Sequence, residues 1–423
     1  MKIRKLITSN LIAIAAIAIQ PCWAQNSLYV VKNDGNVFGY KISEVQEINF
    51  ERQTVNNPVD AMPSDAKALA KKMHLGINIG NTFEAVGSWC DNGGSETCWG
   101  SPVITKQIID EYKKAGFNAI RIPVAWDNYT ENKTDYTIKS AWMSRIKEVV
   151  DYVIADSMYA IINIHWDNGW LEKNCTTSAQ ESVNREQAAL WKQIATCFKG
   201  YGEFLLFASA NEPDVNDAEA ASVLKSYHQT FVNTVRATGG NNAKRCLIVQ
   251  GPSTAIDKSL QYDVLPTDTQ SGRMMFEVHY YPYTYCLMEK DETWGNMSYF
   301  WGNKYQNIYI DGVNRSCAWH TESTVDEDFG NMKRQFVDKG IPVLLGEFAA
   351  MNRTLEGDLQ SKFEESRAYF YEYVVKTAKN NGIVPVLWDT HGSGVIDRDN
   401  CSVANQTAID GLLLGADNGK YPF

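Results

Sequence analysis

Short apolar runs recur along the chain from about residue 64, and segments with helical periodicity separate them. In the clearest helical segment, apolar side chains recur at i, i+3, i+4, i+7 and i+8, which places them on one face of a helix. These residues are Ile146, Val149, Val150, Val153 and Ile154. The apolar runs predict strands over residues 75–81, 118–124, 159–166, 204–210, 246–250, 274–280, 342–348 and 383–389. Eight strands that alternate with helices predict an α/β fold, the (β/α)8 TIM barrel.

The ends of the predicted helices support this alternation. Several helical segments reach a glycine just before the next strand, where a residue that tolerates positive φ commonly ends a helix. These glycines are Gly116, Gly202, Gly340 and Gly382. A last helix is predicted near residues 408–414. Pro385 is unusual inside the eighth strand, because proline donates no backbone hydrogen bond.

The N-terminal residues 1–24 have the pattern of a signal peptide. A basic start precedes an apolar stretch over 11–19, and Cys22-Trp23-Ala24 follows with small residues at the first and third positions. The apolar stretch is too short to cross a bilayer as a helix, and no later segment is apolar enough to do so. We therefore expect cleavage near Ala24 and a secreted protein, either periplasmic or extracellular.

The residues that follow the predicted cleavage site differ from the rest of the chain. Residues 25–50 predict a small β-hairpin appendage, because apolar runs flank the turn sequence Asn33-Asp34-Gly35-Asn36. A further short strand is expected at residues 48–50. A polar, proline-containing linker over 51–63 then leads to the barrel, which is predicted to occupy residues 64–423.

Composition restricts the class of partner. The chain has 423 residues, of which 44% are hydrophobic and 21% charged, so it can form one large core. Its formal net charge of −10 argues against a protein that binds nucleic acid through electrostatics. Neutral polymers need no counter-charge, and the 12 Trp and 21 Tyr supply flat apolar faces for them.

Nine cysteines are present, and eight remain after the predicted cleavage. An even number in an exported chain favours disulfides, although eight cysteines allow 105 pairings. The candidates closest in sequence are Cys90 with Cys98 and Cys286 with Cys317. The cysteines and histidines have no metal-ligand spacing, so a structural zinc site is not expected.

Polar and aromatic side chains follow or end most of the apolar runs. In a barrel of this kind, the carboxyl ends of the strands meet on one face, where active sites lie. We therefore expect one active site made of Arg121, His165, Asn211, Glu212, His279, Tyr281, Glu347 and Trp388.

Two of these residues, Glu212 and Glu347, each follow an apolar stretch where an unpaired charge is unfavourable. They are 347 − 212 = 135 positions apart, so only the fold can bring them together. Two carboxyl groups on either side of one bond are what glycoside hydrolysis requires. With retention, Glu212 is the acid/base, its proton held by like-charge repulsion, and Glu347 is the nucleophile, with its charge stabilised.

Arg121 is the expected donor that stabilises the charge of Glu347, and the Tyr281 hydroxyl is the second. Glu277 is a rival carboxylate. It lies two residues before His279 in a strand whose side chains alternate, so the two share a face. Its deeper position in the barrel favours a supporting ion pair.

The remaining residues are expected to bind or orient the sugar. Asn211 is placed to bind the hydroxyl beside the reacting carbon, a contact that strengthens as charge develops. His165 and His279 are expected to orient their neighbours or the sugar. Trp388 is expected to form the floor beneath the sugar ring just before the cleaved bond.

The ordered set of motifs resembles glycoside hydrolase family five, the cellulase-type members of the retaining clan of eight-fold barrels. The resemblance covers roughly residues 64–423 and implies that Glu212 is the acid/base on the fourth strand and Glu347 the nucleophile on the seventh. It also implies that the remaining active-site positions are occupied by Arg121, His165, Asn211, His279, Tyr281 and Trp388. The matching motifs are Ile79-Gly80-Asn81-Thr82-Phe83-Glu84-Ala85, Arg121-Ile122-Pro123, Ile164-His165, Asn211-Glu212-Pro213, Val278-His279-Tyr280-Tyr281, Gly346-Glu347-Phe348 and Leu387-Trp388-Asp389.

Two segments concern the substrate. Many family members have a second His and a Glu after the third-strand histidine, whereas Trp166-Asp167-Asn168-Gly169-Trp170 stands here. The long segment over 282–323, with Trp294, Trp301 and Trp319, is expected to form a cleft wall. Five tryptophans follow the first three strands, and we expect two or three of them to line the cleft: Trp89, Trp99, Trp126, Trp166 and Trp170.

The sequence thus predicts a secreted, monomeric endo-β-1,4-glucanase that cleaves a polysaccharide with retention and needs no cofactor. Xyloglucan, mixed-linkage glucan and mannan are alternative substrates on the same scaffold. A non-catalytic carbohydrate-binding barrel is a hypothesis from another class. The presence of Glu212, Glu347 and Arg121 favours the enzyme, because a lectin has no use for a deprotonated nucleophile. An inverting hydrolase with a different acid pair is the third alternative.

Overall fold

The structure is a computed structural model that describes residues 27–31, 37–41 and 61–423. The chain divides into two units, Met1–Val59 and Asp60–Phe423, and each is described by itself. In the first unit, β1 (Ser27–Val31) pairs antiparallel with β2 (Val37–Lys41), which agrees with the predicted hairpin. The predicted signal peptide, the strand at 48–50 and most of the linker lie outside the described residues, so the predicted domain boundaries stay predictions.

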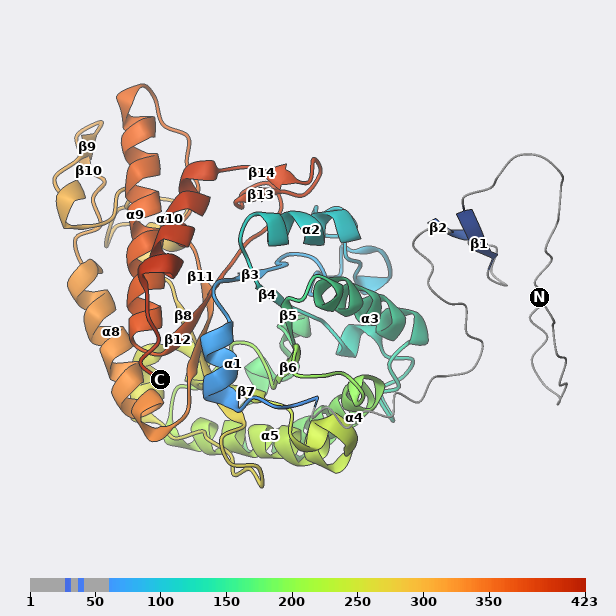
Figure 1. Cartoon of the computed structure of the whole chain (residues 1–423). Coiled ribbons are helices and arrows are strands. Elements are labelled where there is room, and N and C mark those ends of the chain that lie inside the picture. Colours follow the sequence, from blue (N-terminus) through green and yellow to red (C-terminus); the bar gives the residue numbers. More distant parts are fainter. Residues whose placement is uncertain (1–26, 32–36, 42–60) are drawn as a thin grey trace, which may run out of the picture. The chain divides into compact units, whose positions relative to one another are not determined.

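The second unit is built around a closed barrel of eight parallel strands, in the order β11-β12-β3-β4-β5-β6-β7-β8 (Figure 1). The predicted TIM barrel is confirmed, and each predicted strand is present, most of them shorter than predicted. Pro385 lies within the eighth, in register with Leu345. The barrel strands are β3 (Gly76–Asn78), β4 (Ala119–Ile122), β5 (Tyr159–Asn163), β6 (Leu205–Ala208), β7 (Leu247–Gln250), β8 (Met274–Tyr280), β11 (Val343–Phe348) and β12 (Ile383–Leu387).

Helices surround this barrel. The apolar face predicted for the helix over 146–154 lies on α3, where Ile146, Val149, Val150 and Val153 are buried and Ile154 is partly buried. The predicted last helix is α10. The α-helices are α1 (Ala66–Lys72), α2 (Lys106–Lys114), α3 (Ser140–Ala155), α4 (Gln180–Phe198), α5 (Ala218–Ala237), α6 (Ile256–Gln261), α7 (Tyr283–Cys286), α8 (Glu322–Gln335), α9 (Asp358–Asn380) and α10 (Gln406–Asn418). Two-residue strands lie in the loops as β9 (Tyr309–Ile310), β10 (Val313–Asn314), β13 (Ile396–Asp397) and β14 (Ser402–Val403).

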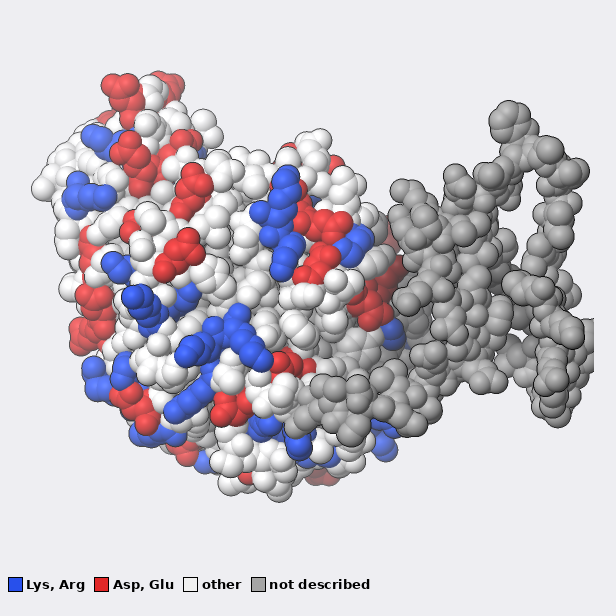
Figure 2. Space-filling view, viewed as in Figure 1, with Lys and Arg blue, Asp and Glu red and all other residues white. Residues whose placement is uncertain are grey.

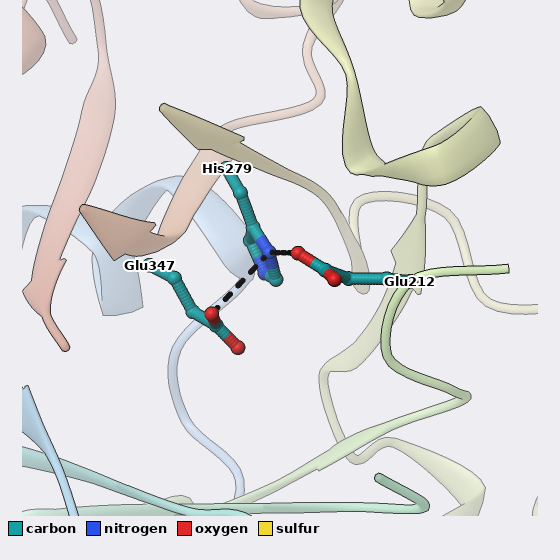
Figure 3. A group of neighbouring side chains, drawn as sticks. All are labelled: Glu212, His279 and Glu347. Atoms are coloured by element: carbon teal, nitrogen blue, oxygen red, sulfur yellow. Dashed lines mark hydrogen bonds and ion pairs between the residues drawn. The ribbon is translucent and has the colours of Figure 1, made fainter. Parts of the chain in front are cut away.

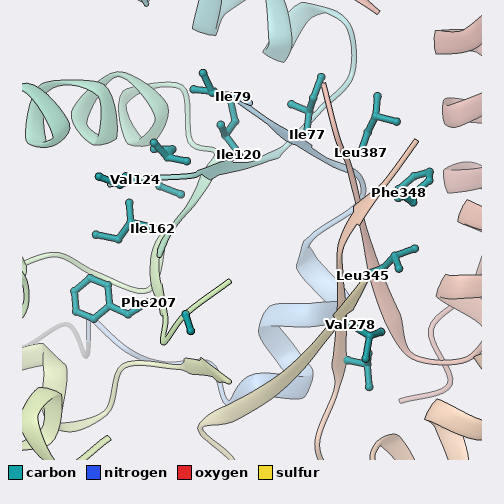
Figure 4. Packing of buried hydrophobic residues seen from close by; sticks show 14 of the residues in the cluster. Ile77, Ile79, Ile120, Val124, Ile162, Phe207, Val278, Leu345, Phe348 and Leu387 are labelled. Carbon is teal, nitrogen blue, oxygen red and sulfur yellow. The ribbon is translucent and has the colours of Figure 1, made fainter. Parts of the chain in front are cut away.

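Strand side chains alternate between two cores. On β4, Ile120 and Ile122 pack outward against the helices, and Arg121 between them points into the barrel. Figure 4 shows the outward set, in which apolar side chains leave the strands toward the helical layer. A second, inner cluster contains side chains such as Leu206, and Leu69 of α1 packs against this cluster. The inner core therefore closes the amino-terminal end of the barrel, and the polar residues occupy the other end.

Three of the four glycines predicted to end a helix adopt the expected positive φ. Gly116, Gly340 and Gly382 have φ of +101°, +96° and +77°. Gly202 does not adopt positive φ, so that prediction was wrong. A Cβ at Gly202 would lie 3.2 Å from the carbonyl oxygen of Ala61, so this glycine instead allows a close approach of two backbone segments.

One of the two predicted cysteine pairs forms a disulfide and the other does not. Cys90 and Cys98 form a disulfide, as predicted. The predicted pair Cys286 and Cys317 was wrong, because both are buried free thiols. Spacing alone cannot distinguish a bridge from two small apolar core residues.

The surface carries mixed charge. Lys and Arg intermingle with Asp and Glu on the face shown in Figure 2. Among the described residues, we find no helix that combines the length and the apolar character needed to cross a membrane.

Candidate active site

The eight predicted site residues converge at the carboxyl ends of the barrel strands. Glu347 lies within β11, where a bulge interrupts the pairing with β8: Leu345 is opposite Val278, and Glu347 is already opposite His279. Gly346 is the additional residue. A Cβ at Gly346 would lie 2.0 Å from Oε1 of Glu277, so only glycine leaves room for that carboxylate. The bulge turns the Glu347 side chain toward the site.

Both oxygens of the Glu347 carboxylate accept hydrogen bonds. Arg121 donates from Nη1 to Oε1 at 2.9 Å, and the Tyr281 hydroxyl donates to Oε2 at 3.0 Å. The predicted donors of Glu347 are therefore in place. Two donors on two oxygens fit a charged carboxylate, since a protonated one would turn its own proton toward one of them.

Arg121 links most of the site from a fully buried position. Its Nη2 donates to Oδ1 of Asn211 at 2.9 Å and forms an ion pair with Oε1 of Glu277 at 3.0 Å. Its Nη1 also donates to Oδ1 of Asn78 at 3.0 Å. The supporting ion pair predicted for Glu277 is confirmed. One cation thus holds two carboxylates and the amide that precedes Glu212.

His279 lies between the two glutamates (Figure 3). Its Nδ1 is 2.7 Å from Oε1 of Glu212 and 3.6 Å from Oε2 of Glu347, and its Nε2 is 3.3 Å from Oε1 of Glu277. Burial opposes the charge of the imidazole, but these three carboxylates outweigh it and raise the pKa of His279 to about 10. His279 is therefore a cation that shares a proton with Glu212.

Carboxylate oxygens of Glu212 and Glu347 approach within 4.8 Å of one another. Retaining glycosidases place their two carboxyl groups about 5–5.5 Å apart, and inverting ones about 6.5–9.5 Å, to leave room for water. The geometry therefore fits retention.

The proton distribution differs from the predicted one. Burial disfavours the charge of Glu212, but the hydrogen bond and the charge of His279 hold its pKa below the ordinary value. Burial raises the pKa of Glu347, against the opposing charges of His279 and Arg121. The prediction that like-charge repulsion raises the pKa of Glu212 was wrong, because the adjacent His279 imidazole lowers that pKa instead.

The cleft that holds these residues has a volume of about 580 Å³, and Glu212 is one of its exposed members. Trp388 lines it and stacks on His165, with ring centroids 5.8 Å apart and an angle of 9° between the rings. Burial, together with the charges of Arg121 and His279, lowers the pKa of His165 well below its ordinary value, so this imidazole is neutral.

Two of the five tryptophans after the first three strands line the cleft, Trp99 and Trp166, in agreement with the prediction. Trp126 instead is fully buried and donates from Nε1 to the carbonyl of Asn163 at 2.8 Å. From the long segment after β8, Cys286 and Leu287 line the cleft, so this segment supplies part of the wall. The tryptophans that the sequence suggested for this wall do not line it: Trp294, Trp301 and Trp319.

Glu172 is a cleft residue that the sequence reasoning missed. It is buried and lines the cleft, and its Oε1 accepts the backbone N–H of Glu212 at 2.9 Å. Its carbonyl accepts the N–H of Asp214 at 2.8 Å, so Glu172 holds the turn that carries Glu212 from both sides. Nothing in the loop after the third strand distinguishes Glu172 from a surface acid, so no sequence signal was available.

Asn78 and Gln250 were also missed. Asn78 donates to the carbonyl of Gly346 at 2.9 Å, which fixes the bulge. Gln250 donates to Oε2 of Glu277 at 2.6 Å and accepts the N–H of Ala210 at 2.8 Å. Both lie at the ends of apolar strands, and the position of a polar residue in the last place of a strand is the signal that could have found them.

Glu212, His279 and Glu347 offer ligand atoms close enough to surround a metal ion. A ligating imidazole must be neutral with a free ring nitrogen. His279 is held as a cation, and its Nε2 already faces Glu277. These three side chains instead form hydrogen bonds and ion pairs with one another and with Glu277.

Removing Arg121 is expected to destabilise the fold strongly. Arg121→Met leaves buried carboxylates without their cation, and breaking a buried pair in this way costs about 3–5 kcal/mol. The free energy of unfolding from urea titration measures the loss. Lys225→Met is the control, because Lys225 and Asp263 form an exposed pair at 2.7 Å, worth at most about 1 kcal/mol. Equal losses in the two variants would contradict the role assigned to Arg121.

Glu172 is expected to make stability depend on pH. Burial raises its pKa from 4.5 to about 7, so the folded state keeps a proton that the unfolded state has lost. The stabilisation is complete below about pH 4.5 and disappears as the pH rises through 7. Relative to Glu172→Gln, the free energy of unfolding of the native protein should fall by up to about 3 kcal/mol between these pH values. Urea titrations of both proteins at several pH values measure it, and parallel curves would contradict it.

A parallel eight-stranded barrel whose strand ends carry two carboxyl groups at retaining distance defines a glycosidase. Comparisons with known proteins agree. The Cellulase family (glycosyl hydrolase family 5) matches residues 83–394, and the chain belongs to this family. It is an O-glycosyl hydrolase, which confirms the predicted resemblance and the predicted class of enzyme.

Relatives share most of the chain. A xyloglucan-specific endo-β-1,4-glucanase from Bacteroides ovatus is 36% identical over 359 residues, which cover 82% of this chain and 69% of that protein. Endoglucanase A from Paenibacillus barcinonensis is 34% identical over 389 residues, covering 86% of this chain and 93% of that protein. A solved structure of a xyloglucan-specific β-1,4-glucanase from a ruminal metagenomic library, in complex with XXLG, is 40% identical, with a TM-score of 0.78, and covers 85% of this chain and 98% of that one.

Proposed function

We propose that the protein is an endo-acting β-1,4-glucanase that cleaves its polysaccharide with retention through a covalent glycosyl-enzyme. The observation that carries this proposal is the approach of the Glu212 and Glu347 carboxylate oxygens to within 4.8 Å. Endoglucanases and xyloglucan-specific β-1,4-glucanases among the relatives support a β-1,4-glucan as the substrate.

In the first step, Glu347 attacks the anomeric carbon as the bond to the leaving oxygen breaks, and Glu212 gives that oxygen a proton. The His279 imidazolium supplies this proton to Glu212 through the hydrogen bond of 2.7 Å between Nδ1 and Oε1. Its transfer leaves a neutral imidazole and a protonated acid. In the second step, Glu212 takes a proton from water, which attacks the same carbon and releases Glu347.

The neighbours assist at the reacting sugar. Asn211, held by Arg121 at 2.9 Å, is placed to bind the hydroxyl beside the anomeric carbon. The Trp388 ring, stacked on neutral His165, provides a flat floor for the sugar ring. These roles follow the sequence predictions, and the contacts described above support them.

Xyloglucan is the second candidate polymer, favoured by the two xyloglucan-specific relatives at 36% and 40% identity. A panel of unbranched β-1,4-glucan, mixed-linkage glucan, xyloglucan and mannan, with sizing of the products, separates the alternatives. Early products of intermediate length support endo attack. Cleavage of mannan without cleavage of any β-glucan would contradict the proposed substrate class.

The stereochemistry of the product tests the mechanism directly. NMR spectra of the fresh product should show the β anomer first, before mutarotation produces the α anomer. First appearance of the α anomer would contradict a covalent intermediate at Glu347 and favour the inverting alternative.

We also propose that the protein is exported after removal of residues 1–24 and acts as a monomer. The Cys90–Cys98 disulfide supports an oxidising compartment. Mass spectrometry of the mature protein from its native host gives the N-terminal residue, and a chain that still starts at Met1 would contradict cleavage near Ala24.

A further inference from the structure

The segment between β8 and α8 exposes three large aromatic side chains that the proposed mechanism does not use. Tyr283, Trp294 and Trp319 are 52%, 65% and 86% exposed. Scattered apolar residues are ordinary on a surface, but a group of them around one depression indicates a binding site. These three residues line the same hollow, which has a volume of about 300 Å³.

The lining of the hollow is aromatic and polar. Besides the three aromatic rings, it contains hydroxyl and amide groups such as those of Ser298, Ser316 and Asn314, together with His320, and no Asp, Glu, Lys or Arg. Such a surface offers flat apolar faces and neutral hydrogen-bonding groups. A sugar ring presents the complementary chemistry, since its C–H face is flat and apolar and its hydroxyls lie around the edge. The volume is at the lower end of the about 300–1,000 Å³ typical of ligand pockets, so it suits a short stretch of sugar.

The hollow is held in shape by its own contacts. The N–H of Ser298 donates to the carbonyl of Thr284 at 2.8 Å, and the two hydroxyls are 3.2 Å apart. The rings of Tyr283 and Trp294 contact each other, with centroids 5.9 Å apart. Trp301 is fully buried and donates from Nε1 to the carbonyl of His320, which lines the hollow. A preformed site of this kind loses little conformational freedom when it binds a ligand.

The hollow lies one short helix away from the active site. Tyr281, Cys286 and Leu287 line the catalytic cleft, whereas Tyr283 and Thr284, between them in sequence, line the hollow. The four residues of α7 span about 6 Å, so the lining of the hollow continues directly into the lining of the cleft along the chain.

We propose that the hollow around Tyr283, Trp294 and Trp319 is a second sugar-binding site, which holds a part of the β-glucan substrate outside the cleft. The proposal rests on the proposed function. It assigns the exposed rings to stacking on glucosyl or branch sugars of the same polymer. A protein partner would require a larger apolar face, and the hydroxyl and amide groups around the aromatic rings favour sugar.

Affinity electrophoresis in native gels that contain xyloglucan or hydroxyethyl cellulose tests the site without turnover, in full-length Glu347→Gln protein. Adding Trp294→Ala and Trp319→Ala should weaken polysaccharide binding about fivefold or more, the effect of truncating aromatic anchors. Tyr309→Ala is the matched control, because Tyr309 is 60% exposed on the same segment but does not line the hollow. Trp319→Ala alone is a second variant. Because Trp319 is 86% exposed, removal of its side chain should leave the fold intact.

Turnover assays in protein that retains native Glu347 distinguish a role of the hollow from a role of the cleft. With both tryptophans replaced, KM for the polysaccharide should rise, and hydrolysis of 4-nitrophenyl β-cellobioside should stay at the native level. Unchanged retardation in the double variant, an equal loss in Tyr309→Ala, or an equal loss of cellobioside hydrolysis would each overturn the proposal. Failure of the native protein to cleave any glucan would overturn the proposed function instead, while the retardation assay would still report on the hollow.

Discussion

Glu347→Gln is expected to lower kcat on β-glucan by on the order of 10⁵-fold, as when a covalent nucleophile is removed from a catalytic unit. Glutamine has nearly the shape of glutamate, and its amide oxygen can still accept a hydrogen bond from Arg121 or Tyr281, which are 2.9 and 3.0 Å from the carboxylate. The amide lacks the charge that attacks the anomeric carbon. Binding of cello-oligosaccharides, measured by calorimetry, should therefore persist while turnover is lost.

Added azide identifies the role of Glu347 independently. In Glu347→Ala, azide can occupy the space of the missing carboxylate and displace an activated leaving group once, which gives the α-glycosyl azide. Detection of that anomer by NMR supports the nucleophile. Native turnover by Glu347→Gln would contradict it and would favour the non-catalytic carbohydrate-binding barrel.

Glu212→Ala should reduce polysaccharide cleavage by about 10²–10⁴-fold, the usual contribution of a positioned acid/base. The effect should depend on the leaving group. A 2,4-dinitrophenyl β-cellobioside needs no proton to leave, so its glycosyl-enzyme should still form at Glu347. A burst of dinitrophenol followed by slow turnover is the expected time course.

Azide should rescue this variant with the opposite stereochemistry. It attacks the glycosyl-enzyme after Glu347 has reacted, so two displacements give the β-glycosyl azide. The α anomer from Glu212→Ala, or equal losses for the natural polymer and the activated substrate, would contradict the assignment of Glu212 as acid/base.

The barrel and the position of most site residues could be predicted because strand periodicity determines both. Arg121 lies between two outward isoleucines, so alternation sends it inward. The same argument placed Glu277 with His279, and the ion pair of 3.0 Å between Arg121 and Glu277 follows from it. These positions follow from the alternation of side chains along each strand and from the meeting of the strand ends on one face. Neither argument needs the geometry of the loops.

Loop geometry and proton positions could not be predicted. Glu172 reaches Glu212 only because a loop folds back over 40 residues of sequence separation. Gly346 leaves room for the Glu277 carboxylate, since a Cβ there would lie 2.0 Å from Oε1 of Glu277, and no local pattern indicates this close approach. The proton on His279 reflects three carboxylates around one imidazole, which is a property of their distances and not of any motif.

The closed end of the barrel bears on how this enzyme could be handled. The Tyr421 hydroxyl donates to the carbonyl of Met73 at 2.8 Å, so the last residues lie beside α1, at the end of the strands remote from the cleft. A tether or fused module joined after Phe423 would leave the groove unobstructed. If the protein were immobilised through Phe423, its catalytic cleft would face away from the support and toward an insoluble fibre.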